Sequence, residues 1–224
     1  MNKFTLIIGN KNYSSWSMRP WILMQHFGIE FNEKIIYLKQ SNSKQEIAQY
    51  SKNKKVPCLI LDQDKNHSIS DSLAICEYLA EKFPAKHLWP QAEMQRAEAR
   101  AIVCEMHSGF MALRNTYNMN IKRKPQITDR QKRINNPELN ADILRIEEIW
   151  TNLLAKQAPN SYLFGEFSIA DAFFAPVALR FNSYDVELNQ NSRNYINFLL
   201  QNESIKQWIE VGLQEEIIII DYEV

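Results

Sequence analysis

The sequence predicts two domains, a small one that mixes strands with helices and a larger one built from helices alone. Up to residue 83, short apolar runs of strand length alternate with stretches of helical periodicity. Between residues 91 and 213 there is no β alternation, and apolar residues recur every three or four positions. Only 5 glycines stand beside 11 Phe, 9 Tyr and 5 Trp in 224 residues, which favours a helix-rich chain with a bulky core. We therefore expect an α/β domain over 1–83, a linker over 84–91 and an all-helical domain over 92–224.

Four short apolar runs in the first domain have the length of strands. They are Phe4–Ile8, 33–38, 57–61 and a brief return through Ile69, which follows a polar turn at 62–66. Helices are expected over 19–27, within 40–55 and after Asp71. Gly28 suits the C-terminal end of the first helix, and Pro20 fits that helix only within its first turn. Strand, helix, strand, hairpin and helix in this order form the thioredoxin-like arrangement.

Two prolines flank Leu88 and Trp89 in the linker, so we expect this pair to anchor it in an apolar surface. In the second domain the periodicity predicts one helix over 92–122, with an apolar stripe from Val103 to Tyr117. Further helical segments are expected around 139–153, after Ser168 and over 195–213. The apolar run 217–220 is too short to span a membrane and is expected to pack on the protein.

Composition and charge exclude several classes of protein. Lysine plus arginine and aspartate plus glutamate both total 26, so the chain lacks the basic excess of a nucleic-acid-binding protein. No apolar run approaches the roughly 20 residues of a membrane span, and no secretory signal is apparent. The three cysteines do not form a disulfide framework, and the histidines lack metal-ligand spacing. We expect a cytoplasmic protein that binds no nucleic acid, no membrane and no metal.

Three short motifs carry residues suited to chemistry, and each also has a purely structural interpretation. Ser14 and Ser17 precede the first helix at the spacing of a redox Cys-x-x-Cys pair; hydroxyls exclude disulfide exchange but suit a helix cap. Val56-Pro57 precedes a strand, where the proline either lies at a sheet edge or forms a cis peptide that turns the neighbouring backbone toward a ligand. Asp71-Ser72 begins a helix, which suits either ordinary capping or a site for a carboxylate with an ammonium beside it.

Taken together with the proline linker and the helical domain, these motifs resemble the cytosolic glutathione transferase family. The resemblance covers essentially the whole chain, from Phe4 to about Gln214. The segment Phe167-Ser168-Ile169-Ala170-Asp171 adds to it, because it matches the capping-box segment of that family's helical domain. The run Ser14-Ser15-Trp16-Ser17 looks closest to the serine-type zeta and theta-like bacterial groups.

The resemblance implies how the chain would bind glutathione. Ser14 would lie near the glutathione sulfur, with Ser15 as the next candidate and Tyr13 as a weaker one. The residues implied for the rest of the tripeptide are the Val56 backbone with a cis Pro57 for the cysteinyl part, Asp71 and Ser72 for the γ-glutamyl head, and Lys55, with Lys39 as the second candidate, for the glycyl carboxylate.

Two positions depart from the family's pattern. Lys54 stands where the family usually has glycine, so the approach to the glycyl end differs. Trp16 stands where zeta members have cysteine, which argues against maleylacetoacetate isomerase activity. For the second substrate, the candidates on the 92–122 helix are His107, Phe110, Met111 and Arg114, although His107 is favoured as a partly exposed structural residue.

The sequence thus indicates a glutathione S-transferase that conjugates the glutathione thiolate to a small apolar electrophile, with a homodimer implied by the resemblance. Two alternatives remain open. One is a glutathione-dependent cis-trans isomerase of the maleylacetoacetate type, and the other is a non-catalytic protein of this fold that serves as an interaction module. The chain keeps both the serine loop and Asp71-Ser72, which favours an enzyme.

Overall fold

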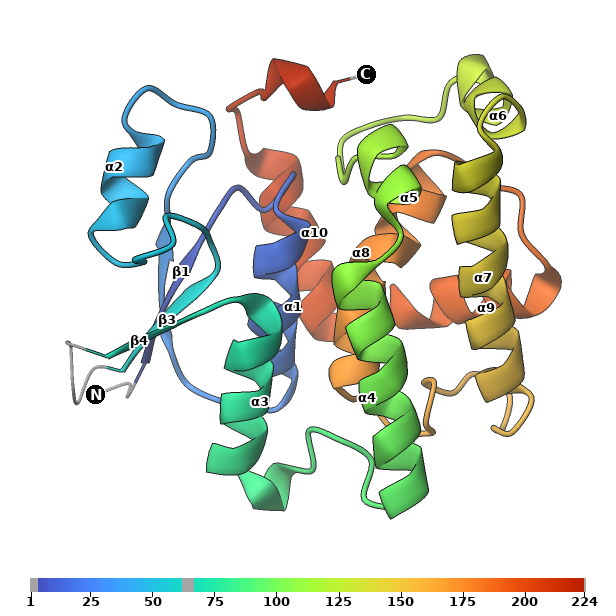
Figure 1. Cartoon of the computed structure of the whole chain (residues 1–224), viewed down its shortest axis with the longest axis horizontal. Helices are drawn as coiled ribbons and strands as arrows, with labels where there is room; N and C mark the ends of the chain where they lie inside the picture. Colours follow the sequence, from blue (N-terminus) through green and yellow to red (C-terminus); the bar gives the residue numbers. More distant parts are fainter. Residues whose placement is uncertain (1–3, 62–66, 224) are drawn as a thin grey trace.

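A computed structural model of the chain describes residues 4–61 and 67–223, and its two parts share one hydrophobic core (Figure 1). The α/β part lies on the left of Figure 1 and the helices α4 to α9 lie on the right, with α1 and α10 between them. The polar turn expected at 62–66 lies outside the described residues. The architecture is the expected one, a thioredoxin-like α/β part joined to an all-helical part.

The α/β part is built on a four-stranded sheet with the order β2-β1-β3-β4. Its strands are β1 (Phe4–Ile8), β2 (Asn32–Ile35), β3 (Cys58–Leu61) and β4 (Ser68–Ser70). β2 runs parallel to β1, with Ile35 opposite Ile8, whereas β3 runs antiparallel to both β1 and β4. β2 ends at Ile35, earlier than the apolar run 33–38 suggests, and the other strands lie where expected.

Helices cover both faces of the sheet. Successive side chains of a strand point to opposite faces, so Leu6 and Ile8 share one face while Ile7 lies on the other. The helices α1 (Ser15–His26) and α3 (Ser72–Lys82) pack on the face of Leu6 and Ile8. The helix α2 (Ser43–Ala48) covers the opposite face, where Ile47 joins Ile7 and Cys58 in a smaller core.

The first helix begins at Ser15 rather than at Arg19, so Pro20 lies inside its second turn, and the expectation that Pro20 occupies the first turn is wrong. The early start follows from Ser14, whose hydroxyl accepts a hydrogen bond from the Ser17 N–H at 3.4 Å and caps the helix. The C-terminal end is as expected, with Gly28 at φ +59° directly after the last turn. The early start places the open N–H groups of α1 beside Ser14 and Ser15.

In the linker, Leu88 and Trp89 are buried as expected, after a short 3-10 helix η1 (Pro84–Lys86). The helical part consists of α4 (Glu93–Ser108), α5 (Met111–Thr116), α6 (Ile127–Ile134), α7 (Pro137–Leu154), α8 (Ile169–Ser183), α9 (Gln190–Leu199) and α10 (Glu203–Gln214). Trp150 on α7 is fully buried against the rings of Phe174, Phe181 and Tyr195. α1 packs against α8 and α10, which joins the two parts of the molecule.

The expectation of one continuous helix over 92–122 is wrong, because the chain breaks between α4 and α5. Gly109 ends α4, and a Cβ atom there would lie 2.8 Å from the carbonyl oxygen of Glu105. Phe110 follows with φ +57°, which no helix interior contains. The apolar stripe from Val103 to Tyr117 is buried all the same, so the periodicity predicted burial correctly and continuity wrongly.

The start of α8 has the capping box that the sequence indicates. Ser168 accepts a hydrogen bond from the Ala170 N–H, and Asp171 accepts one from the Ser168 N–H at 3.0 Å. The buried Asp171 carboxylate also accepts from the Leu163 N–H and the Tyr195 hydroxyl. Burial raises the pKa of Asp171 to about 6 against these hydrogen bonds, which join the start of α8 to Leu163 and to Tyr195 of α9.

After α10 the chain continues as a C-terminal strap, residues 215–223, which ends in the 3-10 helix η2 (Ile220–Tyr222) above α10 in Figure 1. The Glu215 carboxylate accepts from the backbone N–H groups of Lys11 and Asn12 at 2.6 and 3.0 Å. Of the apolar run expected to pack here, Ile219 is buried, whereas Ile218 and Ile220 are exposed. Within residues 4–61 and 67–223, no helix has the length and apolar character of a membrane span.

Candidate functional site

The loop before α1 places Ser14 and Ser15 at the N-terminus of that helix, with both side chains almost fully buried. The Ser14 hydroxyl donates to Ser17 Oγ at 2.8 Å, and Ser17 Oγ also accepts from the Gly9 N–H at 3.1 Å. Ser15 Oγ accepts from Nη2 of Arg180 at 3.3 Å. The capping role of Ser14 is therefore confirmed. The Ser14 hydroxyl already donates its proton to Ser17, whereas the Ser15 hydroxyl only accepts in the contact with Arg180.

Five of the predicted binding residues line one cavity of about 400 Å³, namely Lys55, Val56, Pro57, Asp71 and Ser72. The Val56–Pro57 peptide is cis, as expected. Trp16, the third residue of the serine loop, also lines this cavity. Lys54 lines it too and adopts φ +57°, the left-handed conformation that glycine adopts most easily, which explains why the family that this sequence resembles has glycine there. The Val56-Pro57 and Asp71-Ser72 motifs thus meet around one space, whereas of the serine loop only Trp16 lines it, and Ser14 and Ser15 are not among its described lining residues.

Asp71 caps α3 with one carboxylate oxygen and faces the helical part with the other. Its Oδ1 accepts from the N–H groups of Leu73 and Ala74 at 2.8 and 3.3 Å, and its backbone φ is +95°. Its Oδ2 lies 3.3 Å from Nε2 of His107 on α4. Burial lowers the pKa of His107 although Asp71 opposes the shift, so near pH 7 a neutral ring lies against the carboxylate. His107, favoured from sequence as a structural residue, therefore lies at the candidate site.

Trp16 lines the cavity and also contacts two arginines. The guanidinium carbons of Arg19 and Arg114 lie 4.4 and 4.9 Å from its ring centroid, and the His107 ring meets it edge-on at 5.2 Å. Burial and the neighbouring Arg114 and Arg180 lower the pKa of Arg19 well below its ordinary value. Burial likewise lowers the pKa of Arg180 to about 9. The arrangement concentrates positive charge at the N-terminus of α1, where an anion is favoured.

The C-terminal strap engages two of the weaker candidates. The Tyr13 hydroxyl donates to Glu223 at 2.5 Å, and burial together with this carboxylate raises the pKa of Tyr13. The Lys39 ammonium lies 3.1 Å from the Asp221 carboxylate. Both side chains are thus directed to the strap, and neither is among the described residues that line the cavity.

The four candidates for the second-substrate wall divide into two pairs. His107 and Arg114 contact Trp16 and so border the site. Phe110 is buried in the core, and Met111 is exposed at the start of α5. The break between α4 and α5 causes this division, because a continuous helix would have carried all four candidates along one face.

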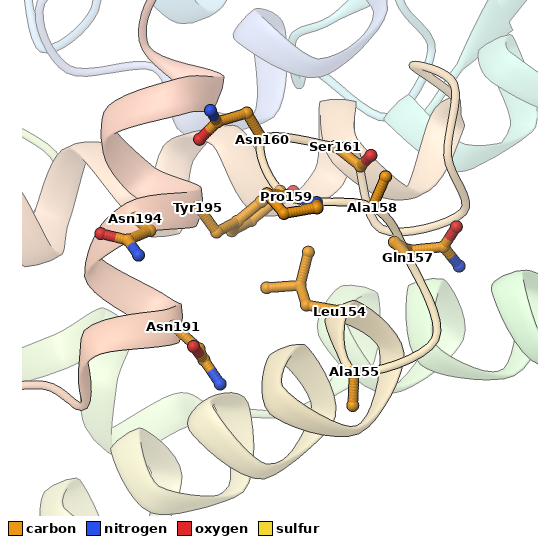
Figure 2. Close-up of a pocket in the computed structure, with 10 residues that line it drawn as sticks. All are labelled: Leu154, Ala155, Gln157, Ala158, Pro159, Asn160, Ser161, Asn191, Asn194 and Tyr195. Atoms are coloured by element: carbon orange, nitrogen blue, oxygen red, sulfur yellow. The ribbon is translucent and has the colours of Figure 1, made fainter.

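A second cavity, of about 410 Å³, lies in the helical part between the end of α7, the loop 155–161 and α9 (Figure 2). Figure 2 shows amide side chains around it, those of Gln157, Asn160, Asn191 and Asn194. Its described lining holds no charged side chain, and the Tyr195 hydroxyl at its inner end donates to Asp171. Across residues 4–61 and 67–223, no cluster of three His, Cys, Asp or Glu side chains is placed to hold a metal ion. The cavity beside α1 is the candidate functional site because it gathers five of the predicted binding residues.

Comparison with known proteins identifies the N-terminal part of the chain. Residues 13–82, which contain the serine loop and all five predicted cavity residues, match the family model of the glutathione S-transferase N-terminal domain. The chain is 33% identical over 102 residues to a probable maleylacetoacetate isomerase of Caenorhabditis elegans and 32% identical over 117 residues to the maleylacetoacetate isomerase of Dictyostelium discoideum. The matches cover 46% and 51% of this chain and equal shares of the relatives, so the chain spans about half the length of the curated relatives it matches.

Solved structures extend the likeness to nearly the whole chain. A glutathione transferase homologue from Burkholderia gl BGR1, solved with bound glutathione, has a TM-score of 0.70 at 23% identity and covers 95% of this chain and 99% of its own. Glutathione transferase Omega 3C from Trametes versicolor has a TM-score of 0.70 at 20% identity, with coverage of 96% and 90%. At these identities the likeness concerns the fold.

Proposed function

The chain has the glutathione transferase fold and carries that family's N-terminal domain, and from this premise we propose that it is an enzyme that adds the thiolate of glutathione to a small electrophile. One observation carries the proposal above the others: a single cavity at the N-termini of α1 and α3 combines an acidic, a basic and a hydroxyl side chain. Glutathione has an ammonium, two carboxylates and a thiol, and this set of side chains is complementary to it.

In the proposed complex, each part of glutathione has a partner in the cavity. Asp71 binds the γ-glutamyl ammonium, and the Ser72 hydroxyl with its own backbone N–H at the start of α3 binds the γ-glutamyl carboxylate. The Val56 backbone pairs with the cysteinyl part, and Lys55 binds the glycyl carboxylate. The thiol lies at the N-terminus of α1, where Ser14 or Ser15 donates a hydrogen bond to it.

One hydroxyl is sufficient to activate the thiol. A free thiol has a pKa of about 8.5, so only about 3% of it is thiolate at pH 7. Raising that share to half requires the pKa to fall by about 1.5 units, which corresponds to about 2 kcal/mol in favour of the anion. A hydrogen bond to a charged group contributes about 1.5–3 kcal/mol, and the dipole of α1 adds to it.

A glutathione-dependent isomerase is the second candidate, because the curated relatives are named maleylacetoacetate isomerases. In a transfer, the carbon–sulfur bond forms once and the product keeps the glutathione. In an isomerisation, the thiolate adds to a double bond, the new single bond rotates, and elimination returns the thiolate. Both reactions need the same glutathione site, so the fate of glutathione distinguishes them.

The test is calorimetric titration with glutathione, followed by assays with aryl halides, peroxides, epoxides and cis-enediones in which the remaining glutathione is measured. We expect saturable binding that is weakened by Ser72→Ala, and consumption of one glutathione per conjugate formed. Turnover without loss of glutathione would assign the isomerase instead. The absence of binding to wild-type protein would overturn both assignments.

A further inference from the structure

Two buried arginines each donate a hydrogen bond to a serine of the candidate site. Nη1 of Arg19 lies 3.4 Å from Oγ of Ser72, and Nη2 of Arg180 lies 3.3 Å from Oγ of Ser15. Arg19 is 0% exposed and Arg180 is 5% exposed. Nε and Nη2 of Arg19 and Nη1 of Arg180 are buried without a hydrogen-bond partner. The two contacts come from different helices, α1 and α8, and reach a serine at the start of α3 and a serine at the start of α1.

Each of these guanidinium groups is a buried charge without a carboxylate in ion-pair contact among the described residues. In the part of the chain that the structure describes, neither Arg19 nor Arg180 forms an ion pair; Arg19 instead lies 4.4 Å from the Trp16 ring centroid and 4.6 Å from that of Phe173. Removing a charge from water without pairing it is costly, so folded proteins seldom keep such groups unless an anion compensates them. The free protein therefore has two buried guanidinium groups beside its candidate glutathione site that form no ion pair with a described residue.

The hydrogen bonds of the three serines determine which hydroxyl protons remain available to a ligand. A hydroxyl carries one proton to donate and accepts through its lone pairs, whereas a guanidinium only donates. Arg19 and Arg180 therefore occupy acceptor positions on Ser72 and Ser15 and leave both protons free for another acceptor. Ser14 differs, because its proton already goes to Ser17 Oγ.

We propose that Arg19 and Arg180 are positioning residues that act through Ser72 and Ser15, orienting these two hydroxyls toward the γ-glutamyl carboxylate and the thiolate of glutathione. The inference rests on the proposed function and makes Ser15, not Ser14, the donor to the sulfur. Bound thiolate glutathione carries three negative charges and one positive charge. With Asp71 opposite the ammonium and Lys55 opposite the glycyl carboxylate, two anions remain, one for each buried arginine.

The other charged groups around Ser15 and Ser72 favour the same polarity. Arg114 on α5 adds a third guanidinium, stacked on Trp16. Asp71 is the acidic group at this site, and its two oxygens already serve the cap of α3 and His107. His107 has a pKa lowered by burial, so it is neutral throughout the range in which a thiol of pKa 7–9 titrates.

The carboxylate half of the inference is tested with two ligands that differ in one group. Dissociation constants are measured for glutathione and for 4-aminobutyryl-cysteinyl-glycine, which lacks only the γ-glutamyl carboxylate. We expect wild type to prefer glutathione at least about tenfold, Arg19→Met to reduce that preference below about threefold, and Arg19→Lys to restore part of it. A packing role for Arg19 would weaken both ligands equally, and that result would overturn the inference.

The thiolate half is tested by the pH dependence of binding. The affinity for glutathione divided by that for γ-glutamyl-alanyl-glycine, measured from pH 6 to 10, reports the pKa of the bound thiol. We expect Ser15→Ala and Arg180→Met to raise this pKa by about one unit, which is a tenfold fall in the ratio of thiolate to thiol at a given pH, and Arg180→Lys to restore part of the shift. A shift in Ser14→Ala with none in Ser15→Ala would overturn the assignment.

Arg130→Met is the matched control, because Arg130 lies on α6 with a side chain that is 79% exposed. It removes one positive charge and is expected to move neither the ligand preference nor the thiol pKa. If Arg180→Met does not fold, the thiol pKa measured for Ser15→Ala and for wild type with the same pair of ligands still tests the thiolate half. Failure of wild type to bind glutathione would refute the proposed function, whereas binding with an unaltered preference in Arg19→Met would refute this inference alone.

Discussion

Asp71 has two tasks that a pair of substitutions can separate. Its Oδ1 caps α3 through the N–H groups of Leu73 and Ala74, and its charge is proposed to hold the glutathione ammonium. Asp71→Asn keeps an oxygen that can accept the cap hydrogen bonds but removes the charge. Asp71→Ala removes both. We expect both variants to lose affinity for glutathione, and only Asp71→Ala to lose stability as well.

The magnitudes follow from the exposure of the carboxylate. Loss of an N-cap costs about 1 kcal/mol, which lowers the melting temperature of a chain of this size by about 2–4 °C. A hydrogen bond to a charged group contributes about 1.5–3 kcal/mol, and because the Asp71 side chain is 43% exposed, solvent screening favours the lower end. The expected loss of glutathione affinity is therefore about tenfold in each variant.

Thermal unfolding measures the stability of the two variants, and calorimetric titration measures their affinity for glutathione. Ser68→Ala on β4 is a suitable surface control, since that side chain lies outside the described lining of the cavity. If Asp71→Asn binds glutathione as tightly as wild type, the proposed contact between the glutathione ammonium and Asp71 is refuted. Equal melting temperatures for wild type and Asp71→Ala would show that the cap contributes nothing measurable.

The remaining predictions concern assembly, the strap and pH. We expect a homodimer, so sedimentation at micromolar concentration should give about twice the 26.3 kDa of one chain, and a single-chain mass would contradict this. Tyr13→Phe should lower the free energy of unfolding by about 1–2 kcal/mol, because the Tyr13 hydroxyl donates to Glu223. The pKa of the bound thiol should stay unchanged in this variant, and a shift in that pKa would show that Tyr13 acts on the thiol after all. Because the folded-state pKa of His107 lies below its unfolded value, its burial stabilises the fold less as the pH falls from 7 through 6.5 toward the folded-state pKa. Denaturant unfolding should therefore show wild type losing more stability than His107→Gln between pH 7.5 and 5.5, and parallel pH curves would contradict the assignment.

The α/β part was predictable because its signals are local. The apolar run Phe4–Ile8 and the left-handed Gly28 each identify an element within a few residues. The predicted start of the first helix was wrong because a proline costs about 3 kcal/mol in a helix interior, which placed Pro20 in the first turn. That rule takes no account of tertiary packing. α1 lies buried between the sheet, α8 and α10, so packing maintains a helix that its sequence alone disfavours.

Gly109 shows the converse limit. A glycine inside an apolar periodicity is compatible with a continuous helix, and the stripe from Val103 to Tyr117 continues across it. Only the structure shows that a side chain at this position would clash with the Glu105 carbonyl. The break redirects Phe110 into the core, and this is why half of the predicted second-substrate wall is absent from the site.

The binding motifs were predictable because each consists of adjacent residues, whereas the arginines behind them act across long separations. Arg180 lies 165 positions from its partner Ser15, and no local rule joins them. A usable signal was nevertheless present: Arg180 is the sole charged residue between Asp171 and Asp185, in a helical stretch that is otherwise largely apolar. A single charge in such a stretch is either costly to the fold or compensated by a partner that the stretch does not contain. Since the described residues supply no carboxylate in ion-pair contact with Arg180, we expect the compensating anion to come from a ligand, which under our proposal binds at Ser15.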